Sequence, residues 1–73
     1  MNDLKIREEM RQKKIDELTT LRTHILTKLA ENYEKLKTLP IAECRLIVQD
    51  NQELVELLNS TEKALRIYNT PIL

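Results

Sequence analysis

The sequence predicts an all-α protein, an antiparallel helical hairpin of two long helices that forms a single domain over residues 1–73. The chain has no Gly, and 33% of its residues are charged, which is typical of long helices and unfavourable for tight turns or paired strands. Apolar residues recur every three or four positions, close to the 3.6-residue helical repeat. Pro40, near the middle of the chain, interrupts this repeat and divides the sequence into two helices.

The first predicted helix covers residues 4–38. Its apolar stripe consists of Leu18, Leu21, Ile25, Leu29, Tyr33 and Leu36. Before Leu18 the stripe thins within the charged stretch KIREEMRQKKIDE, residues 5–17. No helix breaker separates the two parts, so we expect one continuous helix whose first turns are solvated and fray.

The turn is predicted at residues 39–40. Pro40 lacks an amide hydrogen and disfavours helical geometry at Leu39 before it, whereas proline suits the first turn of a following helix. Thr38 and Leu39 are the candidate N-cap residues. A connection this short makes the two helices antiparallel neighbours. The alternative is one long helix kinked at Pro40.

The register of the hairpin follows if the turn is treated as a mirror point. Leu36 then lies near Cys44, and Ile25 lies opposite Leu54. Residues before about Met10 have no partner on the second helix, so we expect their removal to leave the fold nearly intact.

The second predicted helix covers residues 40–68 and is followed by a short C-terminal tail in which Asn69 is the candidate C-cap and Pro71 prevents continuation. Its apolar band has Ile47, Leu54, Leu58 and Leu65 in the centre, Val48 and Val55 on one flank, and Leu46, Leu57, Ala64 and Tyr68 on the other. At roughly 100° per residue this band covers about half of the circumference, more than one facing helix can bury. The hairpin is therefore expected to complete a helical bundle, by self-association as a homodimer or with a protein partner.

Several function classes are disfavoured by the composition. Twelve basic and twelve acidic residues balance, which disfavours nucleic acid and anionic membranes as ligands. No apolar run approaches the roughly 18 residues of a membrane-spanning helix, and the N-terminal segment lacks the apolar middle region of a signal peptide. The single histidine, His24, is interpreted as a surface residue, and the lone Cys44 as a small apolar residue at the edge of the stripe. We find no catalytic, metal-binding or cofactor-binding constellation and no small-molecule site, so a non-enzymatic protein is predicted. The lone cysteine favours a reducing compartment, the cytoplasm.

Two polar residues fall inside the apolar stripes. Arg22 is expected to cover the edge of the core with its stem while its guanidinium reaches water or an acid of the second helix. Asn51 lies one turn from both Ile47 and Leu54. Because a buried amide must find a hydrogen-bond partner, Asn51 is interpreted as setting the register of a helix interface, and Asn51→Leu is expected to raise thermal stability. The alternative is that Asn51 and Gln52 bond to the backbone of a bound protein.

The stretch QDNQELVELLNSTEKAL, residues 49–65, resembles the C-terminal helix of FlgN-type flagellar export chaperones, which carry Asn-Gln and Leu-Leu pairs at similar spacing on an amphipathic helix. The overall plan is also similar to the small helical-hairpin chaperones of type III secretion systems. The resemblance implies that this helix binds an amphipathic C-terminal segment of an export substrate, with Asn51, Leu54, Leu58 and Leu65 facing it.

The predicted function is a non-enzymatic protein–protein interaction module, a small assembly factor or secretion and export chaperone that binds an amphipathic helix of a partner. The alternative is a structural coiled-coil or four-helix-bundle subunit, either a homodimer or part of a larger complex. The predicted protein-interaction residues are Ile47, Asn51, Leu54, Val55, Leu57, Leu58, Leu65 and Tyr68.

Overall fold

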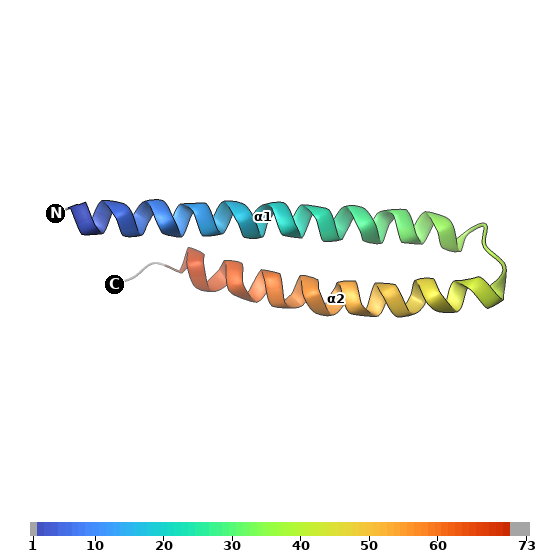
Figure 1. Cartoon of the computed structure of the whole chain (residues 1–73). Helices are drawn as coiled ribbons and strands as arrows, with labels where there is room; N and C mark the ends of the chain where they lie inside the picture. Colours follow the sequence, from blue (N-terminus) through green and yellow to red (C-terminus); the bar gives the residue numbers. More distant parts are fainter. Residues whose placement is uncertain (1, 71–73) are drawn as a thin grey trace.

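A computed structural model describes residues 2–70 as two helices joined by a short turn. Helix α1 spans Asn2–Leu36 and helix α2 spans Ile41–Asn69, and the two run antiparallel and side by side (Figure 1). The described residues contain no strand. The prediction of an all-α antiparallel hairpin is confirmed, and the alternative of one long helix kinked at Pro40 is wrong because the chain reverses direction there.

Helix α1 tolerates several β-branched threonines because their hydroxyl groups bond within the helix. Thr19, Thr23 and Thr27 each donate to the carbonyl oxygen four residues earlier, at 2.8, 3.1 and 2.9 Å. This local bonding satisfies side chains that would otherwise compete with the helical backbone. The N-terminal part of α1 extends past the C-terminal end of α2 (Figure 1), and residues 3–10 are all exposed, as the sequence predicts for this end.

The turn differs in detail from the prediction. Helix α1 ends at Leu36, two residues earlier than expected, where the amides of Thr38 and Leu39 both donate to the Lys35 carbonyl at 3.1 Å. The N-cap of α2 is Pro40, which forms no side-chain capping bond; Thr38 and Leu39 are therefore wrong as N-caps. The Thr38 hydroxyl instead donates to the Lys35 carbonyl at 3.4 Å and closes the end of α1.

The C-terminal end of α2 is capped one residue later than predicted. Asn69 is the last helical residue, and the C-cap is Thr70, whose hydroxyl donates to the Arg66 carbonyl at 2.6 Å. Arg11 of α1 adds a cross-helix bond, with its Nε donating to the Tyr68 carbonyl at 2.6 Å. A cationic group at this position also complements the negative end of the α2 dipole. Pro71 lies outside the described residues.

The register in the middle of the hairpin is shifted by about one helical turn from the prediction. Near the turn, Cys44 Sγ lies 4.0 Å from the Leu36 carbonyl oxygen, as expected. Further along, Asn32 is bonded to Asn51, whereas a mirror point at residues 39–40 would place Ile47 opposite it. Arg22 also pairs with Glu62, where the same mirror point would place Leu57, whereas Arg11 bonds to the Tyr68 carbonyl at the level that the mirror point predicts.

The core of the hairpin is small. Among the described residues only two hydrophobic side chains are buried, Ile25 and Leu29, and three polar side chains are buried with them, those of Asn32, Asn51 and Thr61. The molecule measures 61 × 17 × 13 Å, and its radius of gyration is 17.2 Å, against about 11 Å for a compact domain of this length. Two helices alone therefore form one layer of a helical bundle, with much of their apolar surface still accessible.

Candidate functional site

A polar cluster lies at the centre of the seam between α1 and α2. Asn32 is only 1% exposed, and its Nδ2 donates to Asn51 Oδ1 at 2.9 Å and to Asp50 Oδ2 at 2.7 Å. Both hydrogens of this amide are therefore used. Asn51 itself is buried, as its place in the apolar stripe predicts. None of the buried side-chain nitrogen or oxygen atoms of the described residues lacks a hydrogen-bond partner.

Asn32 was not predicted, although the sequence carries a signal for it. It falls three residues after Leu29 and four before Leu36, which is the spacing of the first apolar stripe. A polar residue on each apolar stripe indicates a candidate cross-helix pair, although the mirror point at the turn would have placed Ile47 opposite Asn32, and the observed pair explains how the buried amide of Asn51 is satisfied. Arg22 behaves as predicted, because its Nε lies 3.4 Å from Glu62 Oε1 on the second helix.

An open groove of about 530 Å³ runs along one side of the seam. The residues that line it are Tyr33, Leu36, Val48, Asn51, Gln52, Val55 and Glu56. Its walls are mainly apolar, and Tyr33, Val48 and Val55 are 58%, 46% and 41% exposed. Such exposure of large apolar side chains around a hollow is typical of a surface that another protein covers.

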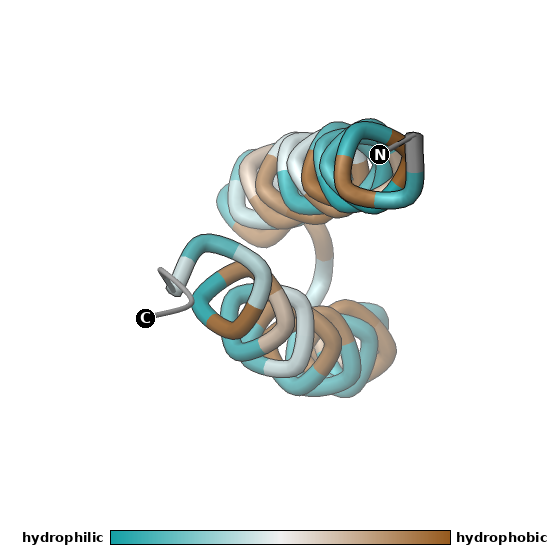
Figure 2. The backbone as a smooth tube through the Cα atoms, turned by 90° about the vertical axis from the view of Figure 1, so that its left-hand side faces the viewer, coloured by the Kyte–Doolittle hydropathy of each residue, from teal (hydrophilic) through white to brown (hydrophobic). Residues whose placement is uncertain are grey.

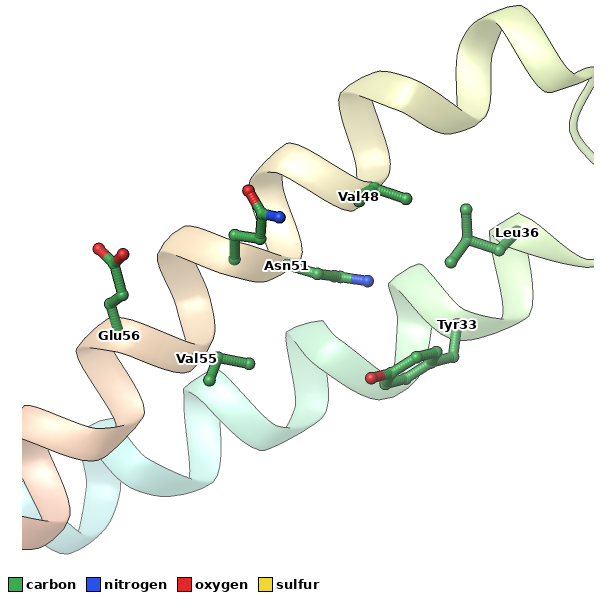
Figure 3. Close-up of a pocket in the computed structure, with 7 residues that line it drawn as sticks. Tyr33, Leu36, Val48, Asn51, Val55 and Glu56 are labelled. Atoms are coloured by element: carbon green, nitrogen blue, oxygen red, sulfur yellow. The ribbon is translucent and has the colours of Figure 1, made fainter.

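The floor of the groove carries one polar group. Figure 3 shows the Asn51 side chain directed between the helices, among Val48, Leu36 and Tyr33, with its nitrogen at the tip. Asn51 Oδ1 accepts the bond from Asn32, while Asn51 Nδ2 donates to no other described residue. Glu56, at the far end of the groove, points away from α1 (Figure 3). The groove therefore offers a mainly apolar surface with the Asn51 donor on its floor and the Glu56 carboxylate at its rim, and Gln52 and Tyr33 add an amide and a hydroxyl to its lining.

The structure divides the predicted interaction residues into two groups. Ile47, Leu54, Leu58 and Leu65 are half-buried along the seam with the buried Asn51. In the hairpin these side chains serve the packing of α2 on α1. Val55 and Leu57 are exposed on opposite flanks of the seam, and Tyr68 is half-buried at the open end beside Arg11. Tyr33 was predicted to lie in the apolar stripe of the first helix and not among the interaction residues, whereas the structure leaves it 58% exposed on the opposite wall of the groove.

The apolar surface left open is large for a chain of this size. Twelve large hydrophobic side chains are exposed among the described residues, against the two that are buried. The chain has 6316 Å² of accessible surface, whereas a compact monomer of this length exposes about 4,700 Å². Figure 2 shows hydrophobic segments of α2 on sides of the tube that do not face α1. The hairpin therefore carries roughly 1,600 Å² more surface than a self-contained domain of its length.

The reactive residue types are not grouped. His24 is exposed, and Cys44 is half-buried with its thiol 3.5 Å from the Leu39 carbonyl oxygen. Within residues 2–70, no group of three or more His, Cys, Asp or Glu side chains could hold a metal ion. Neither of the two helices combines the length and the apolar character needed to cross a membrane.

Comparison of the chain with protein-family models, with curated proteins and with solved structures finds no match. The function of the groove and of the flanking apolar surface is therefore inferred from their geometry and chemistry.

Proposed function

We propose that the protein is a non-enzymatic protein–protein interaction module, a small assembly factor or secretion chaperone whose groove holds an amphipathic helix of a partner protein. The observation that carries this proposal is the open apolar groove lined by Tyr33, Val48 and Val55, with the Asn51 amide on its floor. A guest helix in this groove would complete a three-helix bundle, the helix-in-groove mode of recognition.

The lining defines the chemistry of the guest. Apolar side chains spaced at three, four and seven residues would contact the groove along one face of the guest helix. Asn51 Nδ2 supplies a donor for a carbonyl or side-chain acceptor between these anchors. Glu56 at the rim favours a basic residue at one end of the guest. The groove interior has no other charged residue, which suits an apolar stripe.

The resemblance of residues 49–65 to FlgN-type export chaperones supports the chaperone form of this proposal. The resemblance implies that Asn51, Leu54, Leu58 and Leu65 face the substrate. In this chain the three leucines lie half-buried along the seam. We therefore assign contact with the guest to Val48 and Val55, the exposed flank, together with Asn51. The lone Cys44 is consistent with a cytoplasmic location for this activity.

Site-specific crosslinking in cells tests the proposal. A photo-crosslinking residue is placed at Val48 or Val55 on the groove, and at the exposed Gln49 as a matched control one position from the first site. The expected result is that both groove positions capture the same segment of one partner and the control position does not. A peptide of that segment should become helical when it binds the purified chain. Failure of the groove positions to capture a shared segment would overturn the proposal.

The second candidate is a structural subunit of a four-helix bundle. It is favoured by the roughly 1,600 Å² of accessible surface that the hairpin has in excess of a compact monomer, because one guest helix on one flank would leave the other flank open. In that case a second copy of the chain occupies the groove. Crosslinks from Val48 and Val55 to this chain alone would support the structural subunit and reject the chaperone.

A further inference from the structure

The side chain of Asn51 is buried and still carries an unused hydrogen-bond donor. Asn51 is only 8% exposed, its Oδ1 accepts the bond from Asn32, and its Nδ2 donates to no described residue. Among the described residues no fully buried side-chain nitrogen lacks a partner, so the hairpin does not enclose Nδ2 completely. Figure 3 shows this nitrogen at the tip of the side chain, among Val48, Leu36 and Tyr33. The donor therefore opens onto the groove.

A helix that covers the groove takes water away from this donor. If the covering residue is apolar, Asn51 Nδ2 is left buried without an acceptor, which lowers the affinity of the complex. The backbone carbonyl groups of a helix accept the bonds of their own helix and point along its axis. The acceptor that Asn51 requires is therefore a side chain of the covering helix.

The charges around the groove disfavour a carboxylate as this acceptor. The lining contains one acid, Glu56, and no basic residue. The Asp50 carboxylate shares its donor, Asn32 Nδ2, with Asn51 Oδ1, so a negative charge already lies beside the Asn51 amide. A carboxylate of the guest would meet like charge from Asp50 and Glu56, without a cation in the lining to balance it. The acceptor is therefore a neutral group.

Among neutral groups, a side-chain amide suits the site better than a hydroxyl. The threonines of this chain show why, because the hydroxyls of Thr19, Thr23, Thr27 and Thr61 each donate to the carbonyl four residues earlier in their own helix. A serine or threonine of a guest helix bonds in the same way, which holds its short side chain close to its own backbone. An asparagine or glutamine extends further, offers its oxygen to Asn51 and keeps an NH₂ group that can donate. The Gln52 side chain in the groove lining supplies an acceptor for that group.

On the premise of the proposed function, we propose that the guest helix carries an asparagine or glutamine level with Asn51, between apolar side chains that contact Val48 and Val55. Asn51 follows Val48 by three residues and precedes Val55 by four. The guest therefore presents apolar, amide and apolar residues at i, i+3 and i+7, or at i, i+4 and i+7 if it runs in the opposite direction. With Asn32, the two amides form a polar layer across three helices. One such layer within an apolar interface fixes the alignment of the helices and selects the partner.

A set of designed peptides tests this specificity on the full chain. Each peptide is an amphipathic helix of about 21 residues with leucine three and four positions on either side of one central position, so that it can bind in either direction. The central residue is asparagine, glutamine, aspartate, serine, alanine or leucine, and binding is measured by fluorescence anisotropy of the labelled peptide. The better of the asparagine and glutamine peptides should bind on the order of tenfold more tightly than the alanine and leucine peptides. Tighter binding of the leucine or alanine peptide would overturn the amide layer and leave the helix-binding function of the groove in place.

Variants of the chain show whether the preference comes from Asn51. In Asn51→Leu the preference should reverse toward the leucine peptide, because the donor is gone. Asn32→Leu/Asn51→Leu should reverse it in the same way, and it replaces the single variant if circular dichroism shows that Asn51→Leu loses helicity. A preference for the amide peptides that persists in both variants would overturn the assignment to Asn51.

A matched pair of variants shows whether the peptides bind in the groove. Val55→Asp should abolish binding of all six peptides, because it places a carboxylate in the apolar contact. Leu57→Asp, on the opposite flank of the same helix and similarly exposed, should leave their affinities unchanged. Binding that is lost with Leu57→Asp and kept with Val55→Asp would overturn the placement of the guest. Failure of all six peptides to bind the wild-type chain at about 100 µM would overturn the amide layer together with the proposed helix-binding function.

Discussion

Replacement of Asn51 by leucine tests how the centre of the hairpin is stabilised. From the sequence, Asn51→Leu is expected to raise stability, because it removes a desolvated amide. The structure reverses this expectation, because Asn51 Oδ1 accepts a hydrogen bond from Asn32, which is 1% exposed and cannot exchange that bond for water. The variant leaves one buried N–H of Asn32 without an acceptor.

The expected size of the effect follows from two opposing contributions. An unsatisfied buried donor costs about 1–3 kcal/mol. A leucine at position 51 recovers part of this by apolar burial, up to about 1.5 kcal/mol because the site borders the open groove. We expect the free energy of unfolding to fall by about 1 kcal/mol in Asn51→Leu. In Asn32→Leu/Asn51→Leu the two apolar side chains face each other, and the half-buried Asp50 loses the bond from Asn32 but stays accessible to water, so the free energy of unfolding should return close to the wild-type value.

Urea denaturation followed by circular dichroism measures these differences at one fixed protein concentration. For a small protein, a change of about 1 kcal/mol in the free energy of unfolding shifts the midpoint of urea denaturation by about 1 M. Asn59→Leu, at an exposed position of the same helix, is the matched control and should change stability by less than about 0.5 kcal/mol. A coupling energy of about 1–2 kcal/mol is expected between positions 32 and 51. Stabilisation of the chain by Asn51→Leu alone, with additive effects of the two substitutions, would contradict a stabilising role for the Asn32–Asn51 bond.

The N-terminal turns of α1, the Arg11 bond and association of the chain can each be tested separately. Removal of residues 1–10 should leave the urea midpoint nearly unchanged, because residues 3–10 are all exposed; unfolding of the truncated chain would contradict this. Arg11→Ala should lower the free energy of unfolding by about 1 kcal/mol, through loss of the charged bond to the Tyr68 carbonyl. The effect should exceed that of Arg22→Ala, because the Arg22 side chain is 46% exposed and that of Arg11 is 30% exposed. Hundredfold dilution should lower the melting temperature, since association stabilises the fold; a constant value with monomeric mass would disagree.

Much of the architecture could be predicted from residue spacing, because periodicity reports directly which side of a helix is apolar. The stripe from Leu18 to Leu36 and the break at Pro40 were enough to predict two antiparallel helices, and this is confirmed. Arg22 was correctly expected to reach an acid of the second helix, which is Glu62. These inferences depend on local geometry that varies little between helices.

The register and the open surface could not be obtained in this way. Register depends on where α1 ends, and the end at Leu36 is fixed by backbone bonds of the turn that residue spacing does not encode. The band of α2 showed that more apolar surface exists than one helix can cover. It placed Leu54 and Leu58 at the centre of this band and Val55 and Leu57 on its two flanks, which agrees with their half-buried and exposed positions. It did not show that Tyr33 would be 58% exposed and would form a groove with Val48 and Val55, because that depends on how α1 lies against α2.

The Asn32–Asn51 bond connects this register to the proposed activity. The groove exists because Tyr33 of α1 stands at the level of Val48 and Val55 of α2. A slip of one turn, about 5.4 Å, would move Tyr33 away from these valines, and it would separate Asn32 from Asn51. Apolar side chains alone tolerate such a slip, because leucine and isoleucine recur along both stripes. A single buried amide pair penalises it, because both amides would lose their partner in the interior. The polar pair at the centre of the seam therefore determines where the walls of the groove meet.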